Sequence, residues 1–168
     1  MIITLICGCS VDQTEMQEYV MDPENGLMHA TYSEGVSYKI LYQPVQMIVA
    51  RESRSTEVDK SEIERELGTQ DYFLLEIKRQ DPMEGPKQEF YYAYQFEKDI
   101  FQLVGSDTIR PINFHLEQGL GGSQQFRANI AFSQLENDRE IFIHDKYGAK
   151  TNFIFQQANI NKIPKLSY

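Results

Sequence analysis

Residues 140–155, EIFIHDKYGAKTNFIF, show the clearest alternation of apolar and polar positions in the chain. Asp145 can bond the backbone of the intervening turn, and Gly148 can take a positive φ there without steric cost. A period of two on both sides of such a turn predicts an antiparallel hairpin with one buried face. The side chains expected on that face are Ile141, Ile143, Phe153 and Phe155.

The same alternation predicts further short strands along most of the chain. The expected strands lie within residues 28–32, 36–42, 73–77, 90–96, 101–104, 109–116, 126–132 and the tail 160–166. Eight or nine strands separated by regular turns indicate a sandwich or a barrel rather than a parallel sheet. We expect an immunoglobulin-like antiparallel β-sandwich, with barrel closure as the alternative.

Two segments interrupt the β pattern with helical spacing. Pro44 is followed by apolar residues spaced as in a helix, although residues 46–50 also favour a strand. Ser61 and Glu64 have the spacing of a capping box, and Gly68 can end the helix. We therefore expect a mainly β domain of α+β type, with one or two short helices inserted near residues 44–67.

Composition sets broad limits on function. The 168 residues are enough for one domain with a sizeable core, and 41% of them are hydrophobic. A net charge of −9 argues against a nucleic-acid partner, because binding phosphates requires a basic surface. The only cysteines, Cys7 and Cys9, cannot staple a core, and a structural zinc site would require two further ligands.

The N-terminus resembles the lipobox of bacterial lipoproteins. Residues 1–8 are uncharged and mainly apolar, and Ile6-Cys7-Gly8-Cys9 matches its order of aliphatic, tolerant, small and lipidated positions. The resemblance implies cleavage after Gly8 and acylation of Cys9; the alternative is a buried first strand at residues 3–7. We expect a signal segment at 1–8, a lipidated tether at 9–26 and a single β-rich domain at 27–168. Residues 16–21 have a second interpretation as an edge strand.

A wider resemblance covers most of the chain. Together with the lipobox, residues 42–52, 105–121, 126–134 and 159–166 resemble uncharacterised lipoproteins of Bacteroides-like Gram-negative bacteria. The resemblance implies export and anchoring in the cell envelope, on the periplasmic or the outer-membrane side. It implies no known activity and no cofactor.

Sequence motifs do not indicate an active site. His29, His115 and His144 are scattered and lack metal-ligand spacing such as HxH or HExxH, so we predict no metal site. No serine has the GxSxG context of a nucleophile, and residues 119–122 lack the GKS/T of a phosphate-binding loop. We therefore expect a protein that is not an enzyme, with a hydrolase as the least favoured class.

The aromatic residues 90–96, FYYAYQF, suggest a possible ligand site. If they form a strand, we expect Phe90, Tyr92, Tyr94 and Phe96 to face the core together. Alternatively, exposed Tyr91, Tyr92 and Tyr94 form a platform that stacks on sugar rings. The function classes left open are a non-catalytic anchored module, a glycan- or peptide-binding lipoprotein, and a hydrolase.

Overall fold

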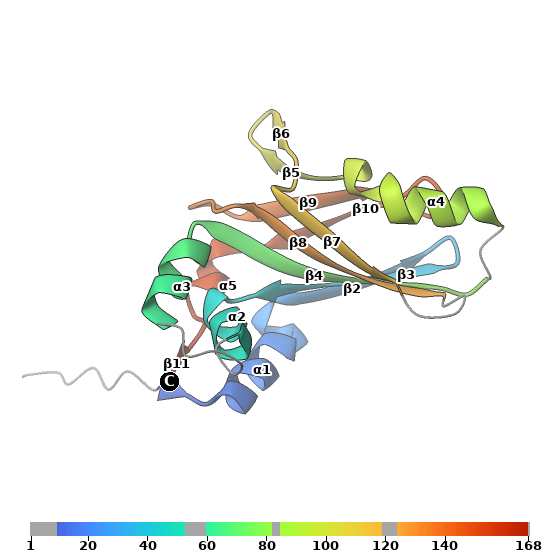
Figure 1. Ribbon diagram of the computed structural model, residues 1–168. Coiled ribbons are helices and arrows are strands. Elements are labelled where there is room, and N and C mark those ends of the chain that lie inside the picture. Colours follow the sequence, from blue (N-terminus) through green and yellow to red (C-terminus); the bar gives the residue numbers. More distant parts are fainter. Residues whose placement is uncertain (1–9, 53–59, 82–84, 119–123, 168) are drawn as a thin grey trace, which may run out of the picture.

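The computed structural model describes residues 10–52, 60–81, 85–118 and 124–167 (Figure 1). Two antiparallel sheets form the body of the protein, and short helices lie at their margins. The prediction of a mainly β, antiparallel sandwich with two short helices near residues 44–67 is therefore confirmed. Those helices are α2 (Val45–Glu52) and α3 (Lys60–Leu67).

The two sheets differ in size. The five-stranded sheet has the order β2 (Met28–Ser33), β3 (Val36–Gln43), β4 (Gln70–Arg79), β8 (Gln125–Ser133) and β7 (Asn113–Gln118). The four-stranded sheet has the order β10 (Lys150–Phe155), β9 (Arg139–His144), β5 (Ile100–Val104) and β6 (Asp107–Ile109). A separate parallel pair joins β1 (Ser10–Val11) to β11 (Lys165–Leu166), near the two ends of the described chain.

The core lies between the two sheets. Alternate residues of β3 and β4 point inward, where the Phe73 ring contacts the Phe155 ring at a centroid distance of 5.1 Å. Phe73 also packs edge-on against Tyr42 and Phe132. This is the packing that the alternating patterns predict, because each strand buries one face of its pleat.

The predicted hairpin of residues 140–155 forms as β9 and β10, with Ile141 paired to Phe153. All four side chains expected on its buried face are buried. The prediction of a positive φ at Gly148 is wrong. Glycine is needed there for space, because a Cβ would collide with the Tyr38 hydroxyl and lie 2.8 Å from Asp145 Oδ2.

The aromatic segment 90–96 is not a strand, so that prediction is wrong. Residues Pro86–Tyr94 form helix α4, and residues Phe96–Asp99 form the 3₁₀ turn η2. Pro86 occupies the first turn, where its fixed φ suits a helix. The buried residues Gln88, Tyr91 and Tyr92 have i, i+3, i+4 spacing.

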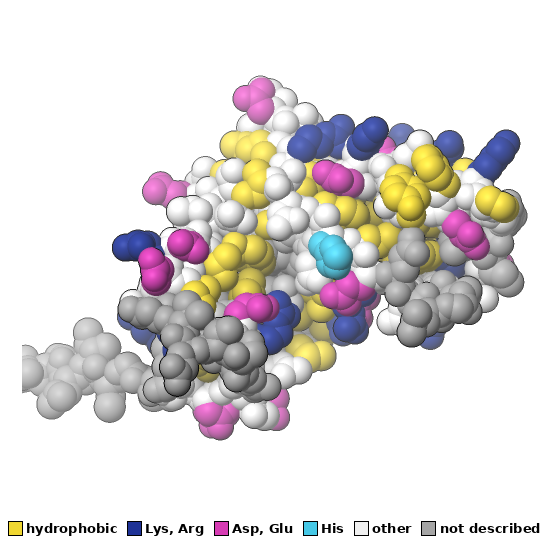
Figure 2. All heavy atoms as spheres, viewed as in Figure 1, with side chains coloured by type: hydrophobic (Ala, Val, Ile, Leu, Met, Phe, Trp, Pro, Cys, Tyr) yellow, Lys and Arg dark blue, Asp and Glu magenta, His cyan; other side chains and the backbone are white. Residues whose placement is uncertain are grey.

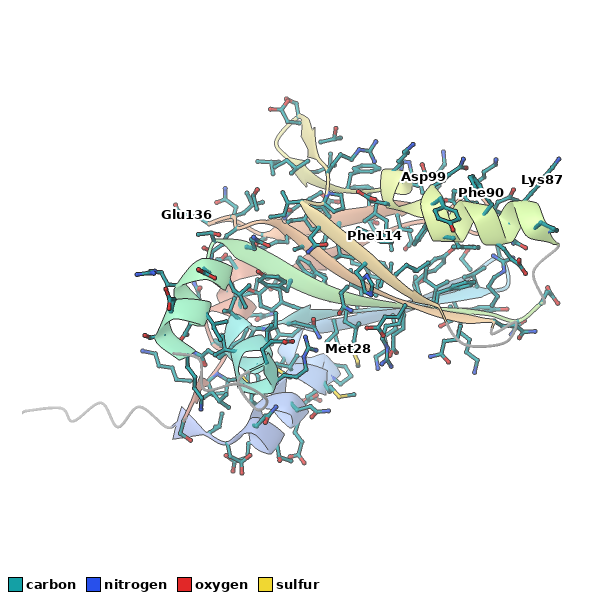
Figure 3. All side chains as sticks on the ribbon, in the orientation of Figure 1. Met28, Lys87, Phe90, Asp99, Phe114 and Glu136 are labelled. Carbon is teal, nitrogen blue, oxygen red and sulfur yellow. The ribbon has the colours of Figure 1, made fainter. Side chains whose placement is uncertain are left out.

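Helical geometry also explains why two of the four residues predicted to face the core in residues 90–96 are exposed to solvent. Phe90 and Tyr94 stand one turn apart on the outer side of α4 and are 53% and 72% exposed. Their rings pack against each other at 5.0 Å. Figure 3 places Phe90 on the same helix as Lys87, and Figure 2 shows apolar side chains at the surface over α4.

Residues 11–25, which are part of the segment predicted as a tether at 9–26, are folded onto the domain. They form helix α1 (Gln13–Met21) and the 3₁₀ turn η1 (Pro23–Asn25). Asp12 and Glu15 form a reciprocal capping box, which satisfies backbone N–H groups of the first turn. Met16 and Val20, one helical turn apart, are completely buried. The tether and edge-strand predictions are both wrong, because this helix buries an apolar face.

Phe153→Ala tests the role of the β9–β10 hairpin in the core. Phe153 is 5% exposed, so truncation should lower the free energy of unfolding by about 3–5 kcal/mol. The measurement is a chemical denaturation curve. Ile154→Ala is the control on the same strand, since Ile154 is 48% exposed and its truncation should cost about 0.5 kcal/mol or less. Equal stability of the parent and Phe153→Ala would contradict the core assignment.

Candidate functional site

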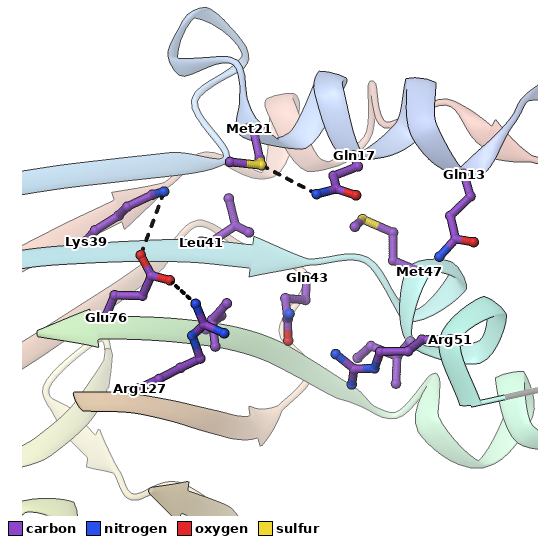
Figure 4. Close-up of a pocket in the computed structure, with 12 residues that line it drawn as sticks. Gln13, Gln17, Met21, Lys39, Leu41, Gln43, Met47, Arg51, Glu76 and Arg127 are labelled. Atoms are coloured by element: carbon purple, nitrogen blue, oxygen red, sulfur yellow. Dashed lines mark hydrogen bonds and ion pairs between the residues drawn. The ribbon is translucent and has the colours of Figure 1, made fainter. Parts of the chain in front are cut away.

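A groove lies on the outer face of the five-stranded sheet, beside α1 and α2 (Figure 4). We call it the outer groove; its volume is about 340 Å³, within the range of small-ligand sites. Strands β3, β4 and β8 supply its floor: Lys39, Leu41, Gln43, Leu74, Glu76 and Arg127. The two helices supply its walls: Gln13, Gln17, Met21, Met47, Ile48 and Arg51.

Strand register places the floor residues in rows. Leu41 pairs with Leu74, and these two leucines form an aliphatic patch across β3 and β4. One row further along, Glu76 lies between Lys39 on β3 and Arg127 on β8. The Glu76 carboxylate lies 2.7 Å from Arg127 Nη2 and 3.8 Å from Lys39 Nζ. The groove therefore joins an aliphatic surface to a paired charge row.

A second hollow of about 230 Å³ adjoins the outer groove; we call it the side lobe. Gln43, Ile48 and Arg51 line both spaces. The side lobe is further lined by Tyr72, Asn113, His115, Asn129 and Ala131, among others. The Tyr72 hydroxyl is buried and has no hydrogen-bond partner among the described residues, and burial raises the pKa of this phenol. It is therefore a buried, neutral hydroxyl beside the side lobe.

This combination of groups suits binding of a small amphipathic molecule. Leu41, Leu74 and Met47 offer apolar contact, whereas amides and guanidinium groups at the margin offer hydrogen bonds. The carboxylate of Glu76 is held by two cations. Glu76 therefore organises the charge row from its position between Lys39 and Arg127.

Two buried carboxylates lie elsewhere, and the first is Asp145 in the β9–β10 loop. Its Oδ2 accepts hydrogen bonds from the Tyr38 hydroxyl at 2.8 Å and the Tyr92 hydroxyl at 2.7 Å. Its Oδ1 accepts from the backbone N–H of Tyr147. Burial raises the pKa of Tyr38 and Tyr92, and the Asp145 carboxylate raises it further. Both phenols therefore stay protonated and donate, which indicates a structural role for this cluster.

The second buried carboxylate, Asp71 on β4, forms an ion pair with Arg139 on β9. Arg139 Nε lies 2.8 Å from Asp71 Oδ2, and the two side chains are 1% and 0% exposed. The Tyr42 hydroxyl also donates to Asp71. Arg139 donates in addition to the Leu135 and Asn137 carbonyls and to the Gln157 side chain. The pair links the two sheets and is closed to a ligand.

The three histidines are on different surfaces. His29 on β2 packs edge-on against Phe155, His115 lines the side lobe, and His144 on β9 packs against Phe101. Across residues 10–52, 60–81, 85–118 and 124–167, no group of three His, Cys, Asp or Glu side chains is placed to hold a metal ion.

The tyrosines proposed as a sugar platform do not share a surface. Tyr91 and Tyr92 are buried in α4, and only Tyr94 is exposed. The Tyr91 hydroxyl donates to Asp99 and accepts from the Lys146 backbone, so its polar end is also engaged. A role for Tyr94 stays a prediction. Cys7, Cys9 and residues 119–122 lie outside the described residues.

Sequence reasoning missed the outer groove, although one signal for it exists. In residues 72–77, YFLLEI, Leu74 interrupts the alternation with an apolar side chain on the outer face. An apolar residue on both faces of a central strand indicates that something covers the outer face. That cover is α1 and α2, which surround the groove.

Comparison of the chain with protein-family models, with curated proteins and with solved structures gave no match. In the part of the chain that the structure describes, the helices are all too short or too polar to cross a membrane.

Burial of His29 generates a pH prediction. Desolvation lowers the pKa of His29 below its ordinary value of 6.5. Between the folded pKa and 6.5 the unfolded chain binds more protons, so stability falls as pH decreases through this window. Denaturation midpoints measured between pH ~7.5 and pH ~5 should fall less in His29→Leu than in the parent. An identical fall in both proteins would show that His29 does not contribute.

Proposed function

We propose that this protein is a non-catalytic binding module of the bacterial cell envelope, with the outer groove as its ligand site. The observation that carries the binding role is the partly buried aliphatic pair Leu41–Leu74 on the floor of the groove, framed by polar and cationic side chains. Monomeric proteins rarely leave concave apolar surface rimmed by polar groups unless it binds something. The buried Tyr72 hydroxyl, for which the described residues supply no hydrogen-bond partner, supports the same conclusion.

The proposed localisation in the cell envelope depends on the N-terminus. What supports it is the Ile6-Cys7-Gly8-Cys9 pattern and the wider resemblance to Bacteroides-like lipoproteins. Lipidation attaches three acyl chains to Cys9 in that pattern. Each buried methylene contributes about 0.8 kcal/mol and one chain holds only marginally, so several chains give lasting attachment. The role of the anchor is then to keep the binding module at a membrane surface.

The amphipathic dye 1-anilinonaphthalene-8-sulfonate tests the outer groove. Its fluorescence should rise on binding to the native protein, and Leu41→Gln/Leu74→Gln should weaken that binding about tenfold or more through loss of the apolar floor. Ile154→Gln is the control, since it changes an exposed aliphatic residue outside the groove. Unchanged thermal melting must accompany each variant. Equal dye affinity in all three proteins would exclude the groove as the site.

Labelling with palmitate tests the anchor. Expression from the native locus, with any upstream codons included, should give a membrane-bound protein that incorporates the label. Cys9→Ala should abolish labelling, whereas Cys7→Ala should leave it largely intact because the resemblance makes position 7 tolerant. A soluble, unlabelled native product would exclude both membrane anchoring and the role in the cell envelope. It would not affect the prediction that the outer groove binds the dye.

A further inference from the structure

Arg51 occupies the place where the outer groove meets the side lobe. It projects from the last turn of α2 and lines both spaces, together with Gln43 and Ile48. In Figure 4 its side chain lies between α2 and the strands of the sheet. A ligand that fills either space therefore meets this guanidinium.

The other two cations of the groove are already paired with a carboxylate. Lys39 and Arg127 share Glu76, which is 24% exposed and lies between them in the sheet. Removing either cation from Glu76 would leave a partly buried carboxylate with fewer partners, which is costly. These two residues therefore hold the charge row together and are less able to bind a ligand.

Arg51 is bound more weakly. Its Nε lies 3.3 Å from the carboxylate of Glu52, and the two side chains are 55% and 59% exposed. Exposed pairs of this kind contribute about 0–1 kcal/mol, so a ligand anion can replace or join Glu52 at little cost. Within the described ranges its two Nη atoms have no hydrogen-bond acceptor. Planar Nη and Nε donors match the geometry of a carboxylate.

An aliphatic floor and a buried hydroxyl near Arg51 indicate the chemistry of the rest of the ligand. Leu41 and Leu74 form an aliphatic floor, and Met47 and Ile48 on α2 extend it toward Arg51. The Tyr72 hydroxyl provides a buried neutral hydrogen-bonding group in the side lobe. The net charge of the whole chain is −9 and repels anions, so binding of an anion in the groove requires a local cation.

We propose that the outer groove selects an aliphatic carboxylate, with its carboxylate on Arg51 and its hydrocarbon part over Leu41 and Leu74. This inference rests on the proposed binding role of the groove and specifies the chemical class of ligand. The chemistry is shared by a short fatty acid and by the C-terminus of a peptide that ends in an apolar residue.

Octanoate and octanamide form a matched pair of probes, because they differ at the head group and share the hydrocarbon chain. In calorimetric titrations the parent should bind octanoate about tenfold more tightly than octanamide, as expected for a charge-assisted contact. Arg51→Gln should bind both probes equally, and Arg51→Lys should recover part of the preference. Arg65→Gln is the matched control, because Arg65 is an exposed arginine of α3 that does not line the groove.

The possible outcomes separate this inference from the proposed function. Equal binding of both probes by the parent, still weakened by Leu41→Gln/Leu74→Gln, would overturn carboxylate selection and leave the groove as a binding site. Loss of preference in Arg65→Gln as well would overturn the assignment to Arg51. Failure of octanoate, octanamide and the dye to bind the folded parent would overturn the groove itself and this inference with it.

A second probe pair distinguishes the two sources of carboxylate. N-acetyl-alanyl-leucine and its C-terminal amide repeat the acid-against-amide comparison on a peptide. Acid preference that depends on Arg51 for the peptide pair would assign the groove to peptide C-termini. The same preference restricted to octanoate would assign it to fatty acids, and either result supports carboxylate selection.

Discussion

Burial of two carboxylates between the sheets is the constraint on which the rest of this structure depends. An isolated carboxylate in an apolar interior is too costly to remain ionised, so each one must be surrounded by donors. Asp71 has Arg139 and the Tyr42 hydroxyl, and Asp145 has the hydroxyls of Tyr38 and Tyr92. The Asp71 cluster joins the five-stranded sheet to strand β9 of the other sheet, and the Asp145 cluster joins it to helix α4 and the β9–β10 loop. These contacts determine how the sheets and the helix pack together.

The Asp145 cluster also determines details that otherwise look unrelated. Tyr92 reaches the carboxylate only because residues 86–94 are a helix rather than a strand. Gly148 must lack a side chain because the Tyr38 hydroxyl occupies that space while it accepts the Ala149 N–H. Arg79 of β4 completes the arrangement by donating to the Tyr92 hydroxyl and the Tyr147 carbonyl. A single buried charge therefore positions a helix, a loop and two strands.

Periodicity predicted those elements in which one face alone is buried. The hairpin β9–β10 is of this kind, since its buried side chains, Ile141, Ile143, Phe153 and Phe155, alternate with less buried ones. Periodicity also placed strand β2 correctly, although its apolar Ala30 and Tyr32 face outward. It failed at residues 90–96, where aromatic residues occupy both the buried and the exposed side of a helix. It also failed at α1, where only Met16 and Val20 are buried in a mostly polar helix and the capping pair Asp12 and Glu15 was the available signal.

The outer groove was beyond sequence reasoning for a different reason. Its aliphatic floor exists only once β3 and β4 pair in the register that places Leu41 beside Leu74. One of its cations, Arg51, comes from a separate helix whose position over the sheet depends on tertiary packing. Sequence patterns report what each segment buries, whereas a binding site depends on what several segments leave open.

The folding of α1 changes what an anchor at Cys9 would do. An extended tether over residues 11–25 would hold the domain up to roughly 50 Å from the lipid head groups. Because β1 begins at Ser10 and is hydrogen-bonded to β11, an acylated Cys9 would instead hold this end of the domain close to the bilayer. Figure 1 shows α1 and α2 near this end, while α4 lies at the far end of the sandwich. Under the proposed lipidation, the groove beside α1 and α2 would be held near the membrane surface, and helix α4 with the Phe90–Tyr94 pair would lie away from it.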